Sequence, residues 1–160
     1  EAAAFQFLAA LLGGSAQTSV LETRLTYDEG ISLTAWAGYN GDALDSGTFS
    51  LGIMPAEGVG MQQAEDAMDR VLADFIANGV DLEQFERVRT ELRSAAIYDL
   101  DDTEGRANYI GSDLALGLTL QDSEDWLNEM IAVTPEQVIA AARALDRRSS
   151  VTGWLMGEDQ

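Results

Sequence analysis

Two stretches in which apolar residues alternate with other residues, 31–37 and 48–54, constrain the fold of this chain more than any other feature. A period of two is typical of a strand that buries one face. The first strand is expected to continue to Tyr39, after which the sequence Asn40-Gly41-Asp42 favours a turn. The two stretches therefore predict an antiparallel hairpin with a loop longer than two residues. A third stretch, residues 150–156, predicts a closing strand.

Helical spacing of apolar residues fills most of the remaining chain. The predicted helices cover residues 1–12, 62–77, 82–96, 104–116, 123–131 and 135–145, and a further helix opens at Thr18 or Ser19 and carries Val20, Leu21 and Leu25 at helical spacing. Strands that cluster in a hairpin, with helices following in a block, are typical of an α+β fold, an antiparallel sheet with helices packed on one face. Because three strands are few for so many helices, we expect one or more further strands before residue 1.

Helix start signals refine several of these boundaries. Thr134, followed by Pro135 and Gln137, has the pattern of a capping box with proline at the first helical position. Asp81 with a glutamine three residues later predicts a second capping box, and Asp122 is expected to cap the helix over 123–131. Since few residues separate the helices over 62–77 and 82–96, we expect these two to pack antiparallel.

Length and charge limit the class of protein. The 160 residues are enough for one domain with a sizeable core, so residues 1–160 are predicted to form a single domain.

The 28 acidic and 9 basic residues give a net charge of −19, and every basic residue is arginine. Such a surface repels phosphate backbones and anionic lipids, which argues against nucleic-acid and membrane partners. A peptide-like or basic partner fits the charge, as does a surface adapted for solubility. No run of about 18 apolar residues predicts membrane insertion.

The chain contains no histidine and no cysteine. This excludes Ser-His-Asp and Cys-His triads, thiol nucleophiles and zinc motifs built on these residues. The acidic stretch over residues 99–105 does not fit a calcium loop, because Glu104 stands where the loop needs its glycine. We therefore predict no catalytic residue and no metal ligand. No two carboxylates stand out as an acid and base pair, so an independent acidic enzyme is only one alternative.

Several segments, in their order along the chain, resemble the C-terminal, zinc-free half of M16 (insulinase/pitrilysin) metallopeptidases, especially bacterial two-subunit members. They are an Ala-rich helix ending in Leu-Gly-Gly, a helix that leads into ISLTAWAGYN, a hairpin, NGVDLEQFERVRTELR (residues 78–93), GSDLALGL (residues 111–118) and VTPEQVIAAARALDRRSSVTGWLMG (residues 133–157). The resemblance covers essentially the whole chain and implies the M16 peptidase/LuxS-like α+β half.

In that family two similar halves enclose an extended polypeptide, and one half carries the zinc motif His-x-x-Glu-His. A chain without histidine cannot be that half, so the resemblance implies a partner role in which this chain supplies chamber wall, peptide contacts and an interface. Zinc is then expected in the partner domain or subunit and not in this chain. The alternative is a catalytically silent structural or binding descendant, like the core subunits of respiratory complexes. The resemblance implies a soluble bacterial protein and does not decide between periplasm and cytoplasm.

The resemblance also points to specific residues at the junction between the second helix and the first strand. Family members often carry an Arg and a Tyr, seven residues apart, that polarise the scissile carbonyl. Here Thr26 and Leu33 occupy those positions, and Val20 replaces the Arg of the Ser-Arg-Leu element. Arg24 and Tyr27 lie close by but in a different helical phase, and are retained as candidate substitutes.

The first strand is the other candidate contact for peptide. An extended peptide can add to an exposed strand edge, with its side chains received by alternate residues of that strand. The sequence therefore predicts substrate contacts at Ile31, Leu33 and Ala35.

Overall fold

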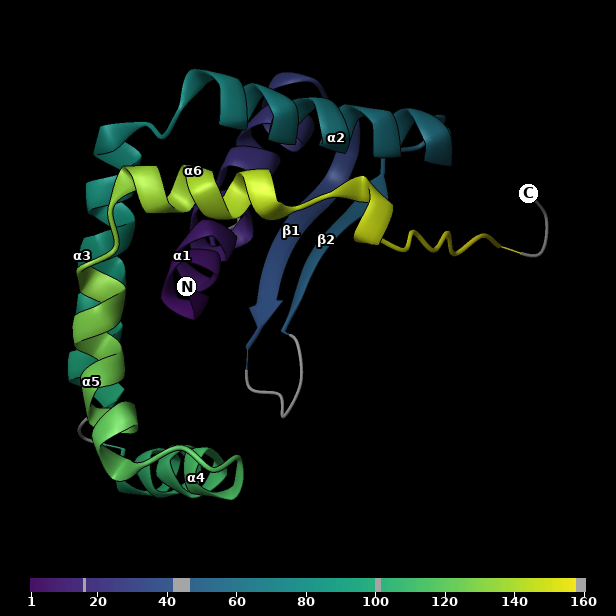
Figure 1. Cartoon of the computed structure of the whole chain (residues 1–160). Helices are drawn as coiled ribbons and strands as arrows, with labels where there is room; N and C mark the ends of the chain where they lie inside the picture. Colours follow the sequence, from purple (N-terminus) through teal and green to yellow (C-terminus); the bar gives the residue numbers. More distant parts are fainter. Residues whose placement is uncertain (16, 42–46, 100–101, 158–160) are drawn as a thin grey trace.

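The structure is a computed structural model that describes residues 1–15, 17–41, 47–99 and 102–157. Figure 1 shows its elements in chain order: α1 (Ala2–Gly13), η1 (Glu22–Asp28), β1 (Ser32–Asn40), β2 (Thr48–Pro55), α2 (Met61–Asn78), α3 (Leu82–Asp99), α4 (Thr103–Ala115), α5 (Leu120–Ile131), α6 (Pro135–Ala144) and η2 (Arg147–Ser149). The α+β prediction is confirmed, because an antiparallel β1–β2 sheet lies under a layer of helices.

The hairpin forms as the alternation predicts. Opposite residues run from Ser32 with Pro55 to Asn40 with Thr48, and an irregularity between Ser32 and Thr34 gives β1 one extra residue near its start. The side chains that face the helices are Ala35, Ala37, Phe49, Leu51 and Ile53, which pack on the core, together with Tyr39, which stacks on Phe5 at 5.3 Å. The turn predicted from Asn40 onward lies largely outside the described residues.

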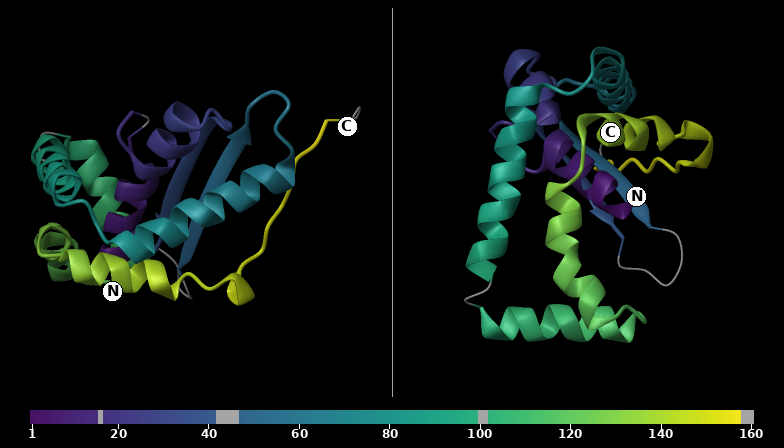
Figure 2. Two further views of the ribbon diagram at one scale, coloured as in Figure 1. Left: turned by 90° about the horizontal axis from the view of Figure 1, so that it is seen from above. Right: turned by 60° about the vertical axis from the view of Figure 1, so that its left-hand side comes forward.

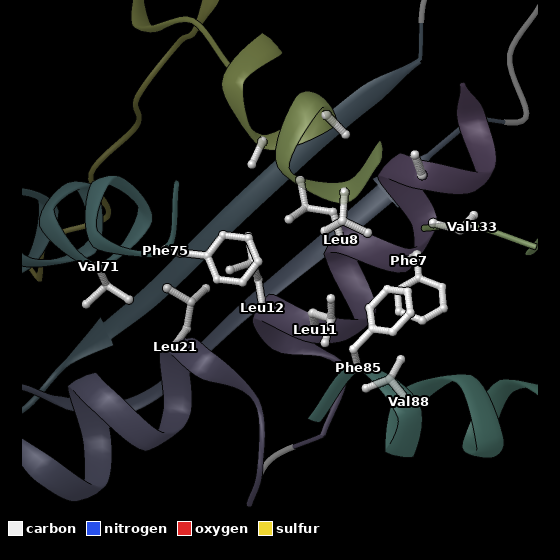
Figure 3. Close-up of a cluster of buried hydrophobic side chains, with 14 of the residues drawn as sticks. Phe7, Leu8, Leu11, Leu12, Leu21, Val71, Phe75, Phe85, Val88 and Val133 are labelled. Carbon is white, nitrogen blue, oxygen red and sulfur yellow. The ribbon is translucent and has the colours of Figure 1, made fainter. Parts of the chain in front are cut away.

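The core is built around α1. Figure 3 shows that Leu8, Leu11 and Leu12 of α1 lie among side chains from α2, α3 and α6 and beside Leu21, the residue before η1, and all three are fully buried. On another side of α1, the rings of Phe7 and Phe85 stack with their centroids 4.5 Å apart. A helix with apolar residues on several faces is expected in such a central position.

The predicted antiparallel packing of α2 on α3 is wrong. In both views of Figure 2 the two helices point in clearly different directions, and α3 packs on α1 and α5 instead. The apolar stripe of α3 explains the difference, because Phe85 and Val88 face the α1 side of the core. Gly79, between the helices, has a φ of 83° that favours glycine and directs the chain away from α2.

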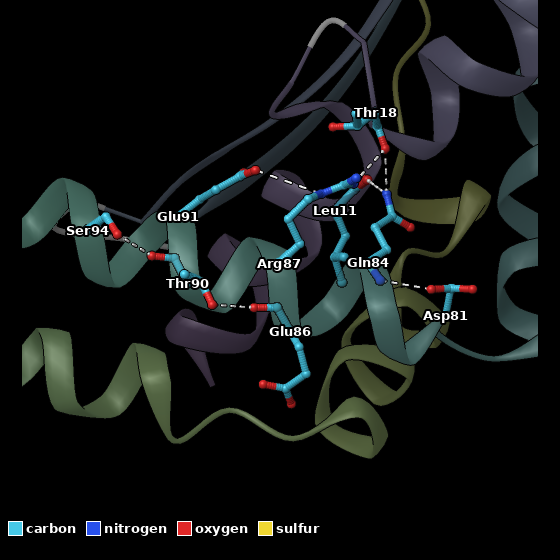
Figure 4. A network of polar contacts seen from close by, with 9 residues as sticks. All are labelled: Leu11, Thr18, Asp81, Gln84, Glu86, Arg87, Thr90, Glu91 and Ser94. Atoms are coloured by element: carbon cyan, nitrogen blue, oxygen red, sulfur yellow. Dashed lines mark hydrogen bonds and ion pairs between the residues drawn. The ribbon is translucent and has the colours of Figure 1, made fainter.

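Polar contacts at the start of α3 hold this helix against α1 and against the segment that follows α1 (Figure 4). The Gln84 N–H donates to Asp81 Oδ1 at 2.8 Å, which confirms the cap. The Gln84 side chain does not complete the predicted capping box. Its Nε2 donates instead to the Thr18 carbonyl at 2.8 Å, and Arg87 reaches the same carbonyl at 3.2 Å.

The starts of α5 and α6 both carry complete capping boxes. Thr134 and Gln137 form the predicted one at α6, with Pro135 in the first turn. At α5 the cap is Thr119 and not Asp122, because Asp122 is the third helical residue and bonds back to the Thr119 N–H at 2.7 Å. The acidic residue was recognised from the sequence, but its position within the capping box was not.

The predicted closing strand at residues 150–156 is also wrong, since these residues have no regular secondary structure and pair with no described strand. Their period of two is still visible. Thr152 Oγ1 and Trp154 Nε1 donate to Glu65 of α2 at 3.3 and 3.0 Å, while Val151 and Leu155 are 99% and 93% exposed. An extended segment becomes a strand only when a neighbour receives its backbone hydrogen bonds, and the described chain offers none.

The remaining helices extend from this body. In Figure 1, α3 and α5 run side by side and α4 crosses their far end. No helix in the described part of the chain is long and apolar enough to cross a membrane.

Candidate functional site

The junction between η1 and β1 is the best-defined candidate site. Residues Glu22–Asp28 form a π-helix, a wider turn that is uncommon and frequent at functional sites. Leu21 and Leu25 are fully buried and fix it to the core. The helix ends at Asp28 with Glu29 as its C-cap, Gly30 follows with a left-handed φ of 62°, and the Ile31 N–H then donates to the Leu25 carbonyl at 2.8 Å. The chain therefore leaves η1 in a defined direction and enters β1 directly.

Glu22 joins the helix to the strand. Its carboxylate is 5% exposed, and one oxygen accepts hydrogen bonds from Thr34 Oγ1 at 2.5 Å and from the Ala35 N–H at 3.2 Å. Burial alone would raise the pKa of Glu22, but hydrogen bonds from Thr34, Thr26 and the Ala35 N–H outweigh burial and hold the pKa below its ordinary value. The group is thus a buried, ionised acceptor at the edge of β1 that faces away from β2.

A second contact ties the same junction to α2. Arg70 donates to both oxygens of Glu29, at 3.0 and 2.7 Å, and this bidentate pair holds the pKa of Glu29 below its ordinary value. Beside it lies an open hollow of about 540 Å³, lined by Ile31, Gln63, Asp66, Ala67 and Arg70. Ile31 therefore borders a surface depression at the start of β1.

The two positions at which the family often carries Arg and Tyr lie close together at this junction. Thr26 Oγ1 is 2.7 Å from the hydroxyl of Ser32, the residue just before Leu33. Leu33 is the extra residue of β1 and is 64% exposed, whereas Ser32 is 4% exposed. Neither a threonine bonded to serine nor a leucine can polarise a carbonyl as arginine and tyrosine can.

The other predicted site residues are placed differently. Arg24 and Tyr27 both lie on η1 and are exposed, Tyr27 by 61%. Ile31 borders the hollow and Leu33 is exposed, but Ala35 is only 2% exposed and its N–H is bonded to Glu22. The irregularity near Ser32 separates these three residues, since it shifts the alternation of side chains between Leu33 and Ala35.

Residues absent from the sequence prediction also belong to this region. Trp36 and Met54 are 49% and 55% exposed, and they lie on the side of the hairpin away from the helices. Glu22 was missed as well, although its place beside Leu21 and three residues before Leu25 in a helix is a signal that it shares their buried side.

The chain has no histidine or cysteine, and within the described ranges no three Asp or Glu side chains lie close enough together to hold an ion. What the junction offers is shape, apolar contact and hydrogen bonding.

Residues 1–92 match the family described as the peptidase M16 inactive domain. Among solved structures, a protease from Helicobacter pylori is similar with a TM-score of 0.78 and 14% identity, over 89% of this chain and 34% of that one. A peptidase M16 inactive domain from Pseudomonas fluorescens is similar with a TM-score of 0.72 and 22% identity, over 89% and 33% of the two chains.

A conserved protein from Enterococcus faecalis is similar with a TM-score of 0.70 and 17% identity, over 88% of this chain and 32% of that one. The chain thus spans about a third of the length of these three proteins. No curated protein matches it. Since the family match covers more than half of the 160 residues, and the fold agrees with a solved member over 89% of the chain, this chain belongs to the M16 peptidase inactive-domain family.

Proposed function

We propose that this domain is the non-catalytic half of an M16-type zinc peptidase, and that it completes the chamber around peptide substrates together with a zinc-bearing His-x-x-Glu-His domain or subunit. The observation that carries the proposal is the family match over residues 1–92 in a chain that has neither histidine nor cysteine. Such a chain can supply binding surface to a peptidase but no zinc ligand of the usual kind.

The η1–β1 junction is the proposed peptide contact. Leu33 is exposed, Ile31 borders the hollow beside Arg70, and the buried carboxylate of Glu22 holds the start of the strand in place. Ala35 is buried and packs in the core on the helix side of β1. Because Thr26 and Leu33 replace the polarising pair, the proposed contribution is positioning of the peptide and exclusion of water, without electrophilic assistance.

Reconstitution with a zinc-bearing M16 subunit tests the proposal. Cleavage of a peptide by the zinc subunit is measured with and without this chain, and with a Leu33→Asp variant that places a charge at the proposed contact. We expect the wild-type chain to raise kcat/KM and Leu33→Asp to reduce that gain. Leu120→Asp is the control, because Leu120 is 50% exposed on α5, away from the junction.

Hydrogen exchange tests the strand contact separately. Added peptide is expected to slow exchange of the Leu33 amide, while the Ala35 amide serves as an internal reference because Glu22 already accepts from it. No change in exchange anywhere in β1 would count against peptide binding at this strand.

A catalytically silent binding or structural domain is the second candidate function. Thr26 and Leu33 favour it, since the groups that would assist chemistry are replaced. In the reconstitution experiment this function predicts a stable complex with the zinc subunit and no gain in cleavage.

A further inference from the structure

The outward face of the hairpin is uncharged in a strongly charged chain. This outer face consists of the side chains that point away from the helices, namely Thr34, Trp36, Gly38 and Asn40 of β1 and Thr48, Ser50, Gly52 and Met54 of β2, together with the exposed Leu33. Neither strand contains an acidic or basic residue, whereas the chain has 28 acidic and 9 basic ones. The open face of an antiparallel sheet usually carries polar side chains, so an uncharged face with large exposed apolar side chains marks a contact surface.

Trp36 dominates this face. A Cβ atom at Gly52, the residue opposite, would lie 2.2 Å from Cε2 of the indole, so the ring lies across β2 in space that only glycine leaves open. Met54 is the diagonal neighbour of Trp36, two residues along β2 from Gly52, a spacing of about 7–8 Å that large side chains bridge. Trp36 and Met54 are 49% and 55% exposed and therefore form one apolar surface.

Negative charge gathers at the end of the hairpin beside this surface. Ser32 lies opposite Pro55, so Asp28, which precedes β1, and Glu57, which follows β2, come to the same end. Both are exposed, and neither forms an ion pair with a described residue. Glu29 is already neutralised by Arg70 and lies in the field of Arg24. A ligand that places a cation at this end and an apolar group on Trp36 matches both features.

We propose that the outer face is a specificity subsite that receives a large apolar side chain of an extended peptide, with a lysine or arginine two residues further along, so that both side chains point to the same side. The proposal rests on the proposed function, because it names the class of peptide that the domain positions. The apolar side chain packs on Trp36 and Met54. The neighbouring cation lies near Asp28 and Glu57, with the face of the indole as a further partner for positive charge.

The test measures binding of three labelled peptides to the full chain by fluorescence anisotropy. The first peptide has a central Phe-Ala-Arg sequence, the second has Ser in place of Phe, and the third has Glu in place of Arg. We expect the wild-type chain to bind the first at least about fivefold more tightly than either analogue, the scale of one good interface side chain. Trp36→Thr and Met54→Thr, which keep residues suited to a strand, are expected to abolish the preference for Phe.

Matched controls exist in the same chain. Trp154 and Met156 are 48% and 55% exposed, nearly equal to Trp36 and Met54, but they lie in the C-terminal segment. Trp154→Thr and Met156→Thr are expected to leave the preference unchanged. Circular dichroism and the midpoint of urea unfolding establish that each variant is folded.

The outcomes separate the subsite from the wider proposal. If the wild-type chain binds all three peptides equally, or if the control variants lose the preference as well, the subsite is overturned and peptide binding by the domain stands. If the wild-type chain binds none of them, peptide contact itself fails. If sedimentation shows a dimer that Trp36→Thr dissociates, the face is a self-association surface and the subsite is overturned.

Discussion

Glu22 is the residue on which the η1–β1 junction most depends. A buried carboxylate is costly unless its charge is met by hydrogen bonds, and here Thr34, Thr26 and the Ala35 N–H supply them. The same bonds occupy an N–H on the outer edge of β1 that would otherwise be open to pairing with another strand. One side chain thus joins two elements and closes part of an edge.

Glu22→Gln tests this role. The variant retains an acceptor but loses the charge, so we expect the free energy of unfolding at pH 7 to fall by about 1–3 kcal/mol. Urea unfolding followed by circular dichroism measures it. Glu57→Gln, a change of the same kind at an exposed position, is the control and is expected to alter stability little.

We also predict how pH changes the difference in unfolding free energy between wild type and Glu22→Gln. The pKa of Glu22 is lower in the folded than in the unfolded chain, so its stabilisation is fully present above the ordinary value of 4.5 and is lost as the pH falls through the folded pKa. The difference in unfolding free energy between wild type and Glu22→Gln is therefore expected to shrink below about pH 4.5. A difference that stays constant down to pH 3 would show that Glu22 is not responsible.

At the scale of elements, the closeness of α1 to β1 determines where the sheet lies. A Cβ atom at Gly13 would be 1.9 Å from the backbone nitrogen of Ala37. Because the backbone fixes the position of a Cβ atom and the Ala37 nitrogen is itself a backbone atom, neither can rotate away, so the helix would have to move off the strand. The Leu-Gly-Gly ending of α1 is therefore a packing requirement as well as a helix stop.

Gly13→Ala is expected to reduce the free energy of unfolding by about 3 kcal/mol or more, at the upper end of overpacking costs. Gly111→Ala is the matched control. Gly111 lies within α4 with open space at its Cβ position, and alanine there is expected to stabilise the protein by about 0.5–1 kcal/mol. Equal effects of the two substitutions would contradict the close approach of α1 to β1.

Glu65 of α2 receives most of the described contacts of the C-terminal segment, and Arg147 also pairs with Asp69 of the same helix. Glu65 accepts from Arg147 at 2.6 Å as well as from Thr152 and Trp154. We expect Glu65→Ala to speed trypsin cleavage after Arg147 and Arg148 several-fold while the unfolding midpoint changes little, because the segment adds nothing to the buried core. Asp66→Ala is the control, since the described contacts of Asp66 are with Gln62 on the same helix.

At the scale of the whole molecule, the net charge of −19 opposes compaction. The described ion pairs lie at exposed or half-exposed sites, where each adds little. We therefore expect sodium chloride to raise the melting temperature between about 0.01 and 0.5 M, as the screening length falls from about 30 Å to a few ångströms. Differential scanning calorimetry measures this, and a lower melting temperature in salt would mean that the ion pairs outweigh the repulsion.

Much of this architecture was predictable because it depends on local patterns. The two hairpin strands, the helix boundary near Thr134 and the absence of histidine follow from neighbouring residues and composition. The candidate site was predictable only in part. Thr26 and Leu33 were located by resemblance, but the buried Glu22, the π-helix and the extra residue beside Ser32 depend on how the strand meets the helix.

The sequence by itself determined the α+β class, the hairpin, the family and the exclusion of histidine- and cysteine-based chemistry, because periodicity, composition and residue order do not depend on distant contacts. Only the tertiary structure decided that α3 packs on α1 and not on α2, that residues 150–156 lack a strand partner, and that Trp36 and Met54 share an open face with Gly52. Each of these depends on long-range contacts, and packing between distant segments determines which face of an element is buried.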